Sequence, residues 1–180
     1  NVVAFRFLIE EVWPIVLRER PDAQLAVVAG PDAELHWARH TSSAAIPDTP
    51  NTRVLGFVSD VRPLYREANL VVVPTRVSAG TNLKVLEAMA MMRAVVSTSS
   101  GCAGLGLEHG QSVWIADAAD QFGSAVLALL HDEQLRARIA REARRIVESQ
   151  FGWEQIGARQ RDLWNELLPR LEIRIRKGTA

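Results

Sequence analysis

The chain has 180 residues, 48% of them hydrophobic, and its 21 basic residues balance 21 acidic ones. These values fit one globular α/β domain, and without a basic excess we expect no nucleic-acid partner. The single cysteine, Cys102, excludes an internal disulfide and a cysteine-cluster metal site. No apolar run reaches the roughly 18 residues of a membrane span. Because the chain begins with Asn1 and shows no secretion signal, we expect a cytoplasmic domain of a longer protein.

Helix and strand patterns alternate from the start of the chain. Apolar residues at helical spacing predict an amphipathic helix over residues 5–20, which Pro14 should kink or end. An apolar run predicts a strand over residues 24–29, and a short helix is expected over residues 33–40.

Two histidines in that short helix, His36 and His40, stand four residues apart. This spacing can bind a metal when both rings face one way. No carboxylate or cysteine cluster nearby completes such a site, so we interpret both as solvated or packing residues.

The next strand is predicted over residues 53–58. Ser59 or Asp60 can cap the helix that follows, which runs through residues 65–68.

The centre of the chain is a strand–loop–helix–strand unit. The β-branched and leucine run at residues 70–73 predicts a strand buried on both faces. A Ser-Ala-Gly-Thr turn then opens a helix over residues 82–92, and residues 94–97 form a second buried strand.

The last part of the chain is predicted to be mainly helical. A small-residue loop at residues 97–106 and a short strand at residues 112–116 come first. Three helices follow: one from Asp117 or Asp120, one from Asp132, and one over residues 154–170. The alternation as a whole predicts a parallel sheet with helices on both faces.

Two charged residues in the central helix stand at positions where their charges are unfavourable. Lys84 lies in the first turn, where exposed N–H groups and the helix dipole favour anions. Glu87 follows one turn later, among apolar residues that leave the helix little solvent face. The two side chains either pair with each other at i,i+3 or hold a ligand, and the spacing alone does not decide between these alternatives.

A family resemblance favours the second alternative, in which Lys84 and Glu87 hold a ligand. The run Gly80-Thr81-Asn82-Leu83-Lys84-Val85-Leu86-Glu87-Ala88-Met89-Ala90, followed by Ala94-Val95-Val96-Ser97-Thr98, resembles the donor-binding signature of retaining glycosyltransferases of the GT-B fold, family-four type. The resemblance implies that residues 1–168 are the carboxyl-terminal, Rossmann-like domain that binds a nucleotide-sugar donor. Residues 169–180 would be a frayed basic tail.

The resemblance also implies roles for individual residues. The donor diphosphate would lie against Gly80, Thr81, Asn82, Leu83 and Lys84. Glu87 would bind the ribose hydroxyls, and the main chain near Phe57 and Val58 would read the base. Ser78, Ala79, Gly101 and Cys102 would form a loop close to the sugar. In the family a glutamate usually stands where this chain has Ala79, so the contact to the transferred sugar is left open, and catalytic residues are expected partly in another domain.

The resembled family fold begins with a strand, whereas this chain opens on a predicted helix, so we expect residues 1–180 to lack that strand. We also expect the acceptor-binding domain to lie outside residues 1–180, which alone should be inactive. The backbone groups that pair with that first strand would then need another partner, and a second copy of the chain in a homodimer could supply it. We expect no metal and no other cofactor, and the longer enzyme can associate peripherally with a membrane.

Two other classes of protein share this pattern. A nucleotide-sugar epimerase of the same fold would need further carboxylates and a histidine near the sugar, and few are found at the strand ends. A non-enzymatic receiver-like domain would carry an acidic cluster after its first strand, and we find none there. Both stay as alternatives to a glycosyltransferase.

Overall fold

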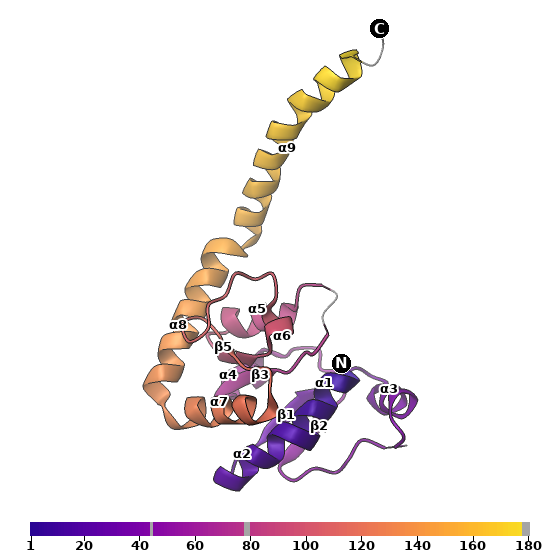
Figure 1. Cartoon of the computed structure of the whole chain (residues 1–180), viewed down its shortest axis with the longest axis vertical. Coiled ribbons are helices and arrows are strands. Elements are labelled where there is room, and N and C mark those ends of the chain that lie inside the picture. The colour runs from indigo at the N-terminus through magenta and orange to yellow at the C-terminus, as the bar shows by residue number, and fades with distance from the viewer. Residues whose placement is uncertain (44, 78–79, 178–180) are drawn as a thin grey trace. The chain divides into compact units, whose positions relative to one another are not determined.

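Helices and strands alternate through residues 1–43, 45–77 and 80–177, the parts of the chain that the computed structural model describes (Figure 1). The chain divides into two units, residues 1–144 and residues 145–180. The first unit holds all the strands of the described residues. The donor-site candidates that can be placed therefore all lie in the first unit.

The strands of the described residues form two parallel sheets. β1 (Leu25–Val28) pairs with β2 (Thr52–Leu55). In the second sheet, β4 (Ala94–Ser97) lies between β3 (Leu70–Val73) and β5 (Trp114–Ile115). All three pairings are parallel, so the α/β class predicted from the sequence is confirmed.

The first helical stretch is longer than predicted and passes through its proline. It consists of α1 (Val2–Arg6), the π-helix η1 (Phe7–Val12) and α2 (Trp13–Glu19) without a break. Pro14 lies in the first turn of α2, and because α2 continues directly from η1, its missing N–H cannot bond back to the preceding turn. The helical stretch does not end at Pro14; it changes from the π form to the α form just before it.

Helices cover both faces of the β3–β4–β5 sheet. Ala94 and Val96 belong to a buried cluster with α7 (Ala119–His131) on one face. Val95 is also fully buried but is absent from that cluster, because alternate residues of a strand point to opposite faces. That opposite face packs against α5 (Leu83–Ala90).

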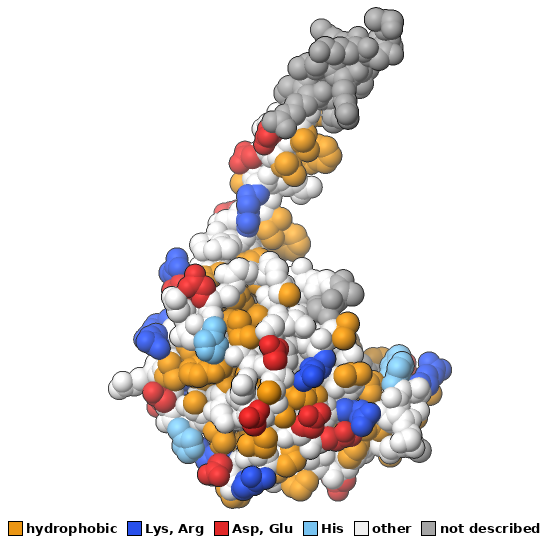
Figure 2. Space-filling view, viewed as in Figure 1, with side chains coloured by type: hydrophobic (Ala, Val, Ile, Leu, Met, Phe, Trp, Pro, Cys, Tyr) orange, Lys and Arg blue, Asp and Glu red, His pale blue; other side chains and the backbone are white. Residues whose placement is uncertain are grey.

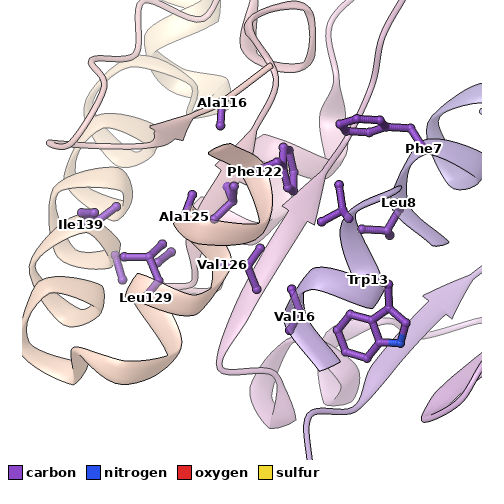
Figure 3. Close-up of a cluster of buried hydrophobic side chains, with 14 residues drawn as sticks. Phe7, Leu8, Trp13, Val16, Ala116, Phe122, Ala125, Val126, Leu129 and Ile139 are labelled. Atoms are coloured by element: carbon purple, nitrogen blue, oxygen red, sulfur yellow. The ribbon is translucent and has the colours of Figure 1, made fainter. Parts of the chain in front are cut away.

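The cluster on the α7 face is the main core of the first unit (Figure 3). Phe122 of α7 is fully buried and meets the ring of Phe7 edge to face, with the ring centroids 5.9 Å apart. Val16 of α2 and Ile139 of α8 (Glu133–Gln150) are also fully buried in it. The first helical stretch is thus fixed to α7 and, through α7, to the second sheet.

The two sheets are not hydrogen-bonded to each other, and a cavity of about 520 Å³ lies where they face. Residues 24–26 of the β1 side and residues 70–73 of β3 line it. Among the described residues, β1 and β3 each have one edge without a strand partner. The prediction that residues 70–73 are buried on both faces is wrong for residues 70–72, which are only half-buried because they border this cavity.

Several predicted boundaries shift. The strand expected over residues 53–58 ends at Leu55, and that expected over residues 112–116 is reduced to β5 and a single bridge from Val113 to His109. The loop expected over residues 97–106 contains the short helix α6 (Ser99–Cys102), which the Thr98 hydroxyl caps by accepting from the Gly101 amide at 3.0 Å.

Of the remaining helices, one matches its predicted bounds and others differ. α3 (Ala33–His40) matches its prediction, and α4 (Arg62–Glu67) is a short helix after β2. α9 (Trp153–Lys177) continues past the predicted end near residue 170, while residues 178–180 of the proposed tail lie outside the described residues. No described helix combines the length and hydropathy needed to cross a bilayer.

One face of the molecule shows how the charges are distributed. Acidic and basic side chains are interspersed with apolar ones over the described part of this face (Figure 2). The balanced composition therefore corresponds, on this face, to a mixed surface.

Candidate functional site

The helix start that follows β3 brings the predicted diphosphate residues together. α5 begins at Leu83, with Asn82 as its N-terminal flanking residue. The Leu83 and Val85 amides donate to the Thr81 and Asn82 carbonyls at 3.0 and 2.9 Å, which tightens the first turn. Gly80 and Thr81 are exposed, as is the Leu83 side chain, so the approach to this helix end is open.

Lys84 is partly buried in the wall of the cavity between the sheets. This burial lowers the pKa of its ammonium group. A carboxylate partner would oppose that shift, but Lys84 has none among the described residues. The i,i+3 ion pair with Glu87 that the sequence allowed is therefore not formed.

Glu87 instead accepts a hydrogen bond from another helix. The Tyr65 hydroxyl of α4 donates to Glu87 Oε2 at 3.0 Å, across 22 positions of sequence. Burial, and then the neighbouring carboxylate, raises the pKa of Tyr65, so the phenol stays protonated as a donor. No pattern in the sequence indicates this contact, because it joins two short helices, α4 and α5, that lie on either side of β3 in the chain.

Lys84, Glu87 and Tyr65 all line the same cavity. A cation and a carboxylate one helical turn apart, each without an ion-pair partner among the described residues, offer one group for an anion and one for hydroxyl donors. This combination suits a ligand that carries both phosphate and sugar hydroxyls.

The predicted base-reading residues lie in the turn between β2 and α4. Phe57 is 74% exposed, and Val58 beside it is half-buried. The turn is fixed by Asp60, whose carboxylate accepts from the Arg62 amide at 3.0 Å and from the Arg62 side chain at 2.8 Å. These contacts hold the pKa of Asp60 at about 2. The N-cap position of α4 is Val61, without a side-chain cap, so neither Ser59 nor Asp60 is the capping residue that the sequence suggested, and Asp60 binds the first helical amide from one residue further back.

The loop predicted to lie near the sugar is only partly described. Ser78 and Ala79 lie outside the described residues. Gly101 is buried, and a Cβ there would come within 2.3 Å of Ser97 Oγ and 2.9 Å of the Val73 carbonyl oxygen. Cys102 is 6% exposed, and burial raises the pKa of its thiol. A buried thiol that stays protonated is a poor nucleophile, which agrees with a role for Cys102 in packing.

The Asp117 carboxylate, expected from the sequence to start the next helix, instead holds this loop in place, while that helix, α7, begins at Ala119 after Ala118. Asp117 accepts from the Ser99 amide at 2.8 Å and from the Ser99 hydroxyl at 2.5 Å. These bonds lower the pKa of Asp117. Arg76, just beyond β3, donates to the Asp117 carbonyl at 3.0 Å, so the ends of β3, β4 and β5 are tied together.

The described residues hold no group of three or more metal-binding side chains. His40 Nδ1 lies 2.8 Å from the His36 carbonyl oxygen, so one ring nitrogen of this histidine pair is already engaged.

Comparison with known proteins decides the family. A family model described as glycosyl transferases group 1 matches residues 1–132. The chain belongs to this family. Its relationship to GT-B glycosyltransferases, first suggested by residues 80–98, is thereby confirmed.

Individual relatives of this group 1 glycosyltransferase chain are distant. An uncharacterized 44.6 kDa protein in the cps region of Klebsiella pneumoniae is 29% identical over 133 residues, which cover 71% of the chain and 33% of that protein. The chain thus spans about a third of the length of this curated relative.

Solved structures show the same fold. The C-terminal domain of the group 1 glycosyl transferase LpcC from Francisella tularensis matches with a TM-score of 0.66 and 22% identity, covering 83% of this chain and 80% of that one. Anabaena Alr3699/HepE, solved in complex with UDP and glucose, matches with a TM-score of 0.66 and 18% identity, covering 87% of this chain and 44% of that one.

Proposed function

We propose that residues 1–168 form the donor-binding half of a glycosyltransferase that moves a sugar from a nucleotide-diphosphate sugar to an acceptor. The observation that carries this proposal is the pair of Lys84 and Glu87 at the start of α5, without an ion pair between them among the described residues. Family membership and the UDP complex of the Anabaena protein support it. UDP is therefore the first ligand to test within a panel of nucleoside diphosphates.

In this proposal the diphosphate binds at the start of α5, where the positive end of the helix dipole and the Lys84 ammonium favour an anion. Glu87 accepts hydrogen bonds from the two ribose hydroxyls. Phe57 and Val58 border the base, and the loop at Gly101 and Cys102 shapes the sugar end through its main chain.

We further propose that a strand ahead of Asn1 occupies the part of the cavity between the two sheets that lies between residues 24–26 and residues 70–73, and not the part lined by Tyr65, Lys84 and Glu87, which is kept for the donor. β1 and β3 each have a parallel partner on one edge only, β2 for β1 and β4 for β3, and residues of both line this space, with no strand on the other edge among the described residues. A parallel strand there would join the two sheets and satisfy both edges.

Glu87→Gln tests the donor site. The amide keeps the shape but loses charge-assisted hydrogen bonds, so nucleoside diphosphate binding should weaken by about 1.5–3 kcal/mol while stability barely changes. Calorimetric titration of the full-length protein with UDP and its 2′,3′-dideoxy analogue measures this effect. The variant should lose its preference for the hydroxylated ligand, whereas Lys84→Met should weaken both ligands alike.

A matched control is Glu19→Gln, the same change at an exposed carboxylate of α2. It should leave both affinities unchanged. If Glu87→Gln keeps the full hydroxyl preference, the ribose assignment is wrong.

Donor binding should not need a metal, because Lys84 and the helix end can meet the diphosphate charge. Titrating UDP into the full-length protein with and without a chelator measures this directly. We expect the two affinities to agree. A loss greater than about tenfold, or about 1.4 kcal/mol, on chelation would contradict the expectation.

A further inference from the structure

The Glu87 carboxylate has one oxygen engaged and one open. Oε2 accepts the hydrogen bond from the Tyr65 hydroxyl at 3.0 Å. Oε1 has no hydrogen-bond partner among the described residues. The exposed Glu87 side chain is thus bound through Oε2, while Oε1 can accept a hydrogen bond from a ligand.

The position of Tyr65 is set by α4 and by the partial burial of its ring. It lies within α4, whose start is fixed by the contacts of Asp60 with the amide and guanidinium of Arg62. Its ring is half-buried along the cavity that Lys84 and Glu87 also line. The elevated pKa of the phenol keeps its proton available for donation throughout the neutral range.

We propose that Tyr65 is a positioning residue for donor binding: its hydroxyl fixes Glu87 Oε2 so that Oε1 is presented to the ribose hydroxyls. The inference rests on the proposed role of Glu87. A glutamate has several rotatable bonds, and fixing them before the ligand arrives removes part of the ordering cost of binding. Tyr65 touches no reacting atom in this scheme and acts only through Glu87.

Tyr65→Phe removes the hydroxyl and keeps the ring that packs along the cavity. The ratio of the dissociation constants of 2′,3′-dideoxy-UDP and UDP, measured on the full-length protein, reports the ribose contribution alone. We expect this ratio to fall about three- to tenfold in Tyr65→Phe, since an unheld carboxylate must be ordered by the ligand. The affinity for the dideoxy ligand should stay within about twofold of the unaltered protein.

The double variant Tyr65→Phe/Glu87→Gln separates positioning from a structural effect. If Tyr65 acts only through Glu87, adding Tyr65→Phe to Glu87→Gln should change the ratio no further. Thermal unfolding of each variant confirms that the compared proteins are folded.

The outcomes distinguish the two proposals. If Glu87→Gln lowers the ratio and Tyr65→Phe leaves it unchanged, the positioning role is overturned while the ribose role of Glu87 stands. If Tyr65→Phe lowers the ratio further in the Glu87→Gln background, Tyr65 acts on the ligand directly, and the positioning role is again overturned. If Glu87→Gln itself keeps the ratio, the proposed function of Glu87 fails and the inference fails with it.

Discussion

Residues 1–180 alone should bind a nucleoside diphosphate but transfer no sugar. Glycosyl transfer by a two-domain enzyme requires donor and acceptor to be held together, and such positioning is worth effective molarities on the order of 10⁵ M or more. The chain spans about a third of the Klebsiella relative and 44% of the Anabaena structure. We therefore expect its transfer rate to be at least about 10⁵-fold below that of the full-length enzyme.

The measurement is sugar transfer from a labelled donor, compared between residues 1–180 and the full-length protein. UDP binding by the same preparation of residues 1–180 serves as the control that the donor site is folded. Turnover above the background of a donor-only reaction would show that one domain suffices and would contradict the expectation.

Replacing Phe122 with alanine should cost about 3–5 kcal/mol of unfolding free energy. The ring is fully buried and is the largest such side chain among the described residues. It joins α7 to η1 through its edge-to-face contact with Phe7, so its removal leaves a cavity between the elements that hold the first unit together. Urea unfolding followed by tryptophan fluorescence measures the loss.

Phe57→Ala is the matched control for this substitution. It removes the same side chain from a position that is 74% exposed, so stability should change by less than about 0.5 kcal/mol. An equal loss of stability in the two variants would show that the Phe122 cluster is not the core of the unit.

The elements with strong periodicity could be predicted from the sequence. The uninterrupted run at residues 70–73 and the strand at residues 94–97 were placed to the residue, because β-branched runs between turn signals have few other solutions. The central helix was predicted two residues too long at its C-terminal end, since a helix end depends on main-chain bonds such as Arg93 N to the Ala88 carbonyl.

Features that depend on distant contacts could not be predicted. The partner of Glu87 is Tyr65, on a helix before β3, and spacing along α5 gives no information about it. The short helix α6 depends on the Thr98 cap and on Asp117 from beyond β5, neither of which stands out in a run of small residues. The half-burial of residues 70–72 arises from the interruption of the sheet, which an apolar run cannot reveal.

In residues 1–180 alone, without the proposed joining strand, the break between the sheets gives the two halves of the first unit separate routes to local unfolding. Among the described residues, no strand pairing joins β1–β2 to β3–β4–β5, and side-chain packing of the first helical stretch on α7 links them instead. β1–β2 can therefore unfold locally without breaking the hydrogen bonds of the β3–β4–β5 sheet. Phe57 follows β2, whereas Lys84 and Glu87 follow β3. In the proposed binding mode, such an opening would release the base of a bound nucleotide first, while its diphosphate and ribose stay held.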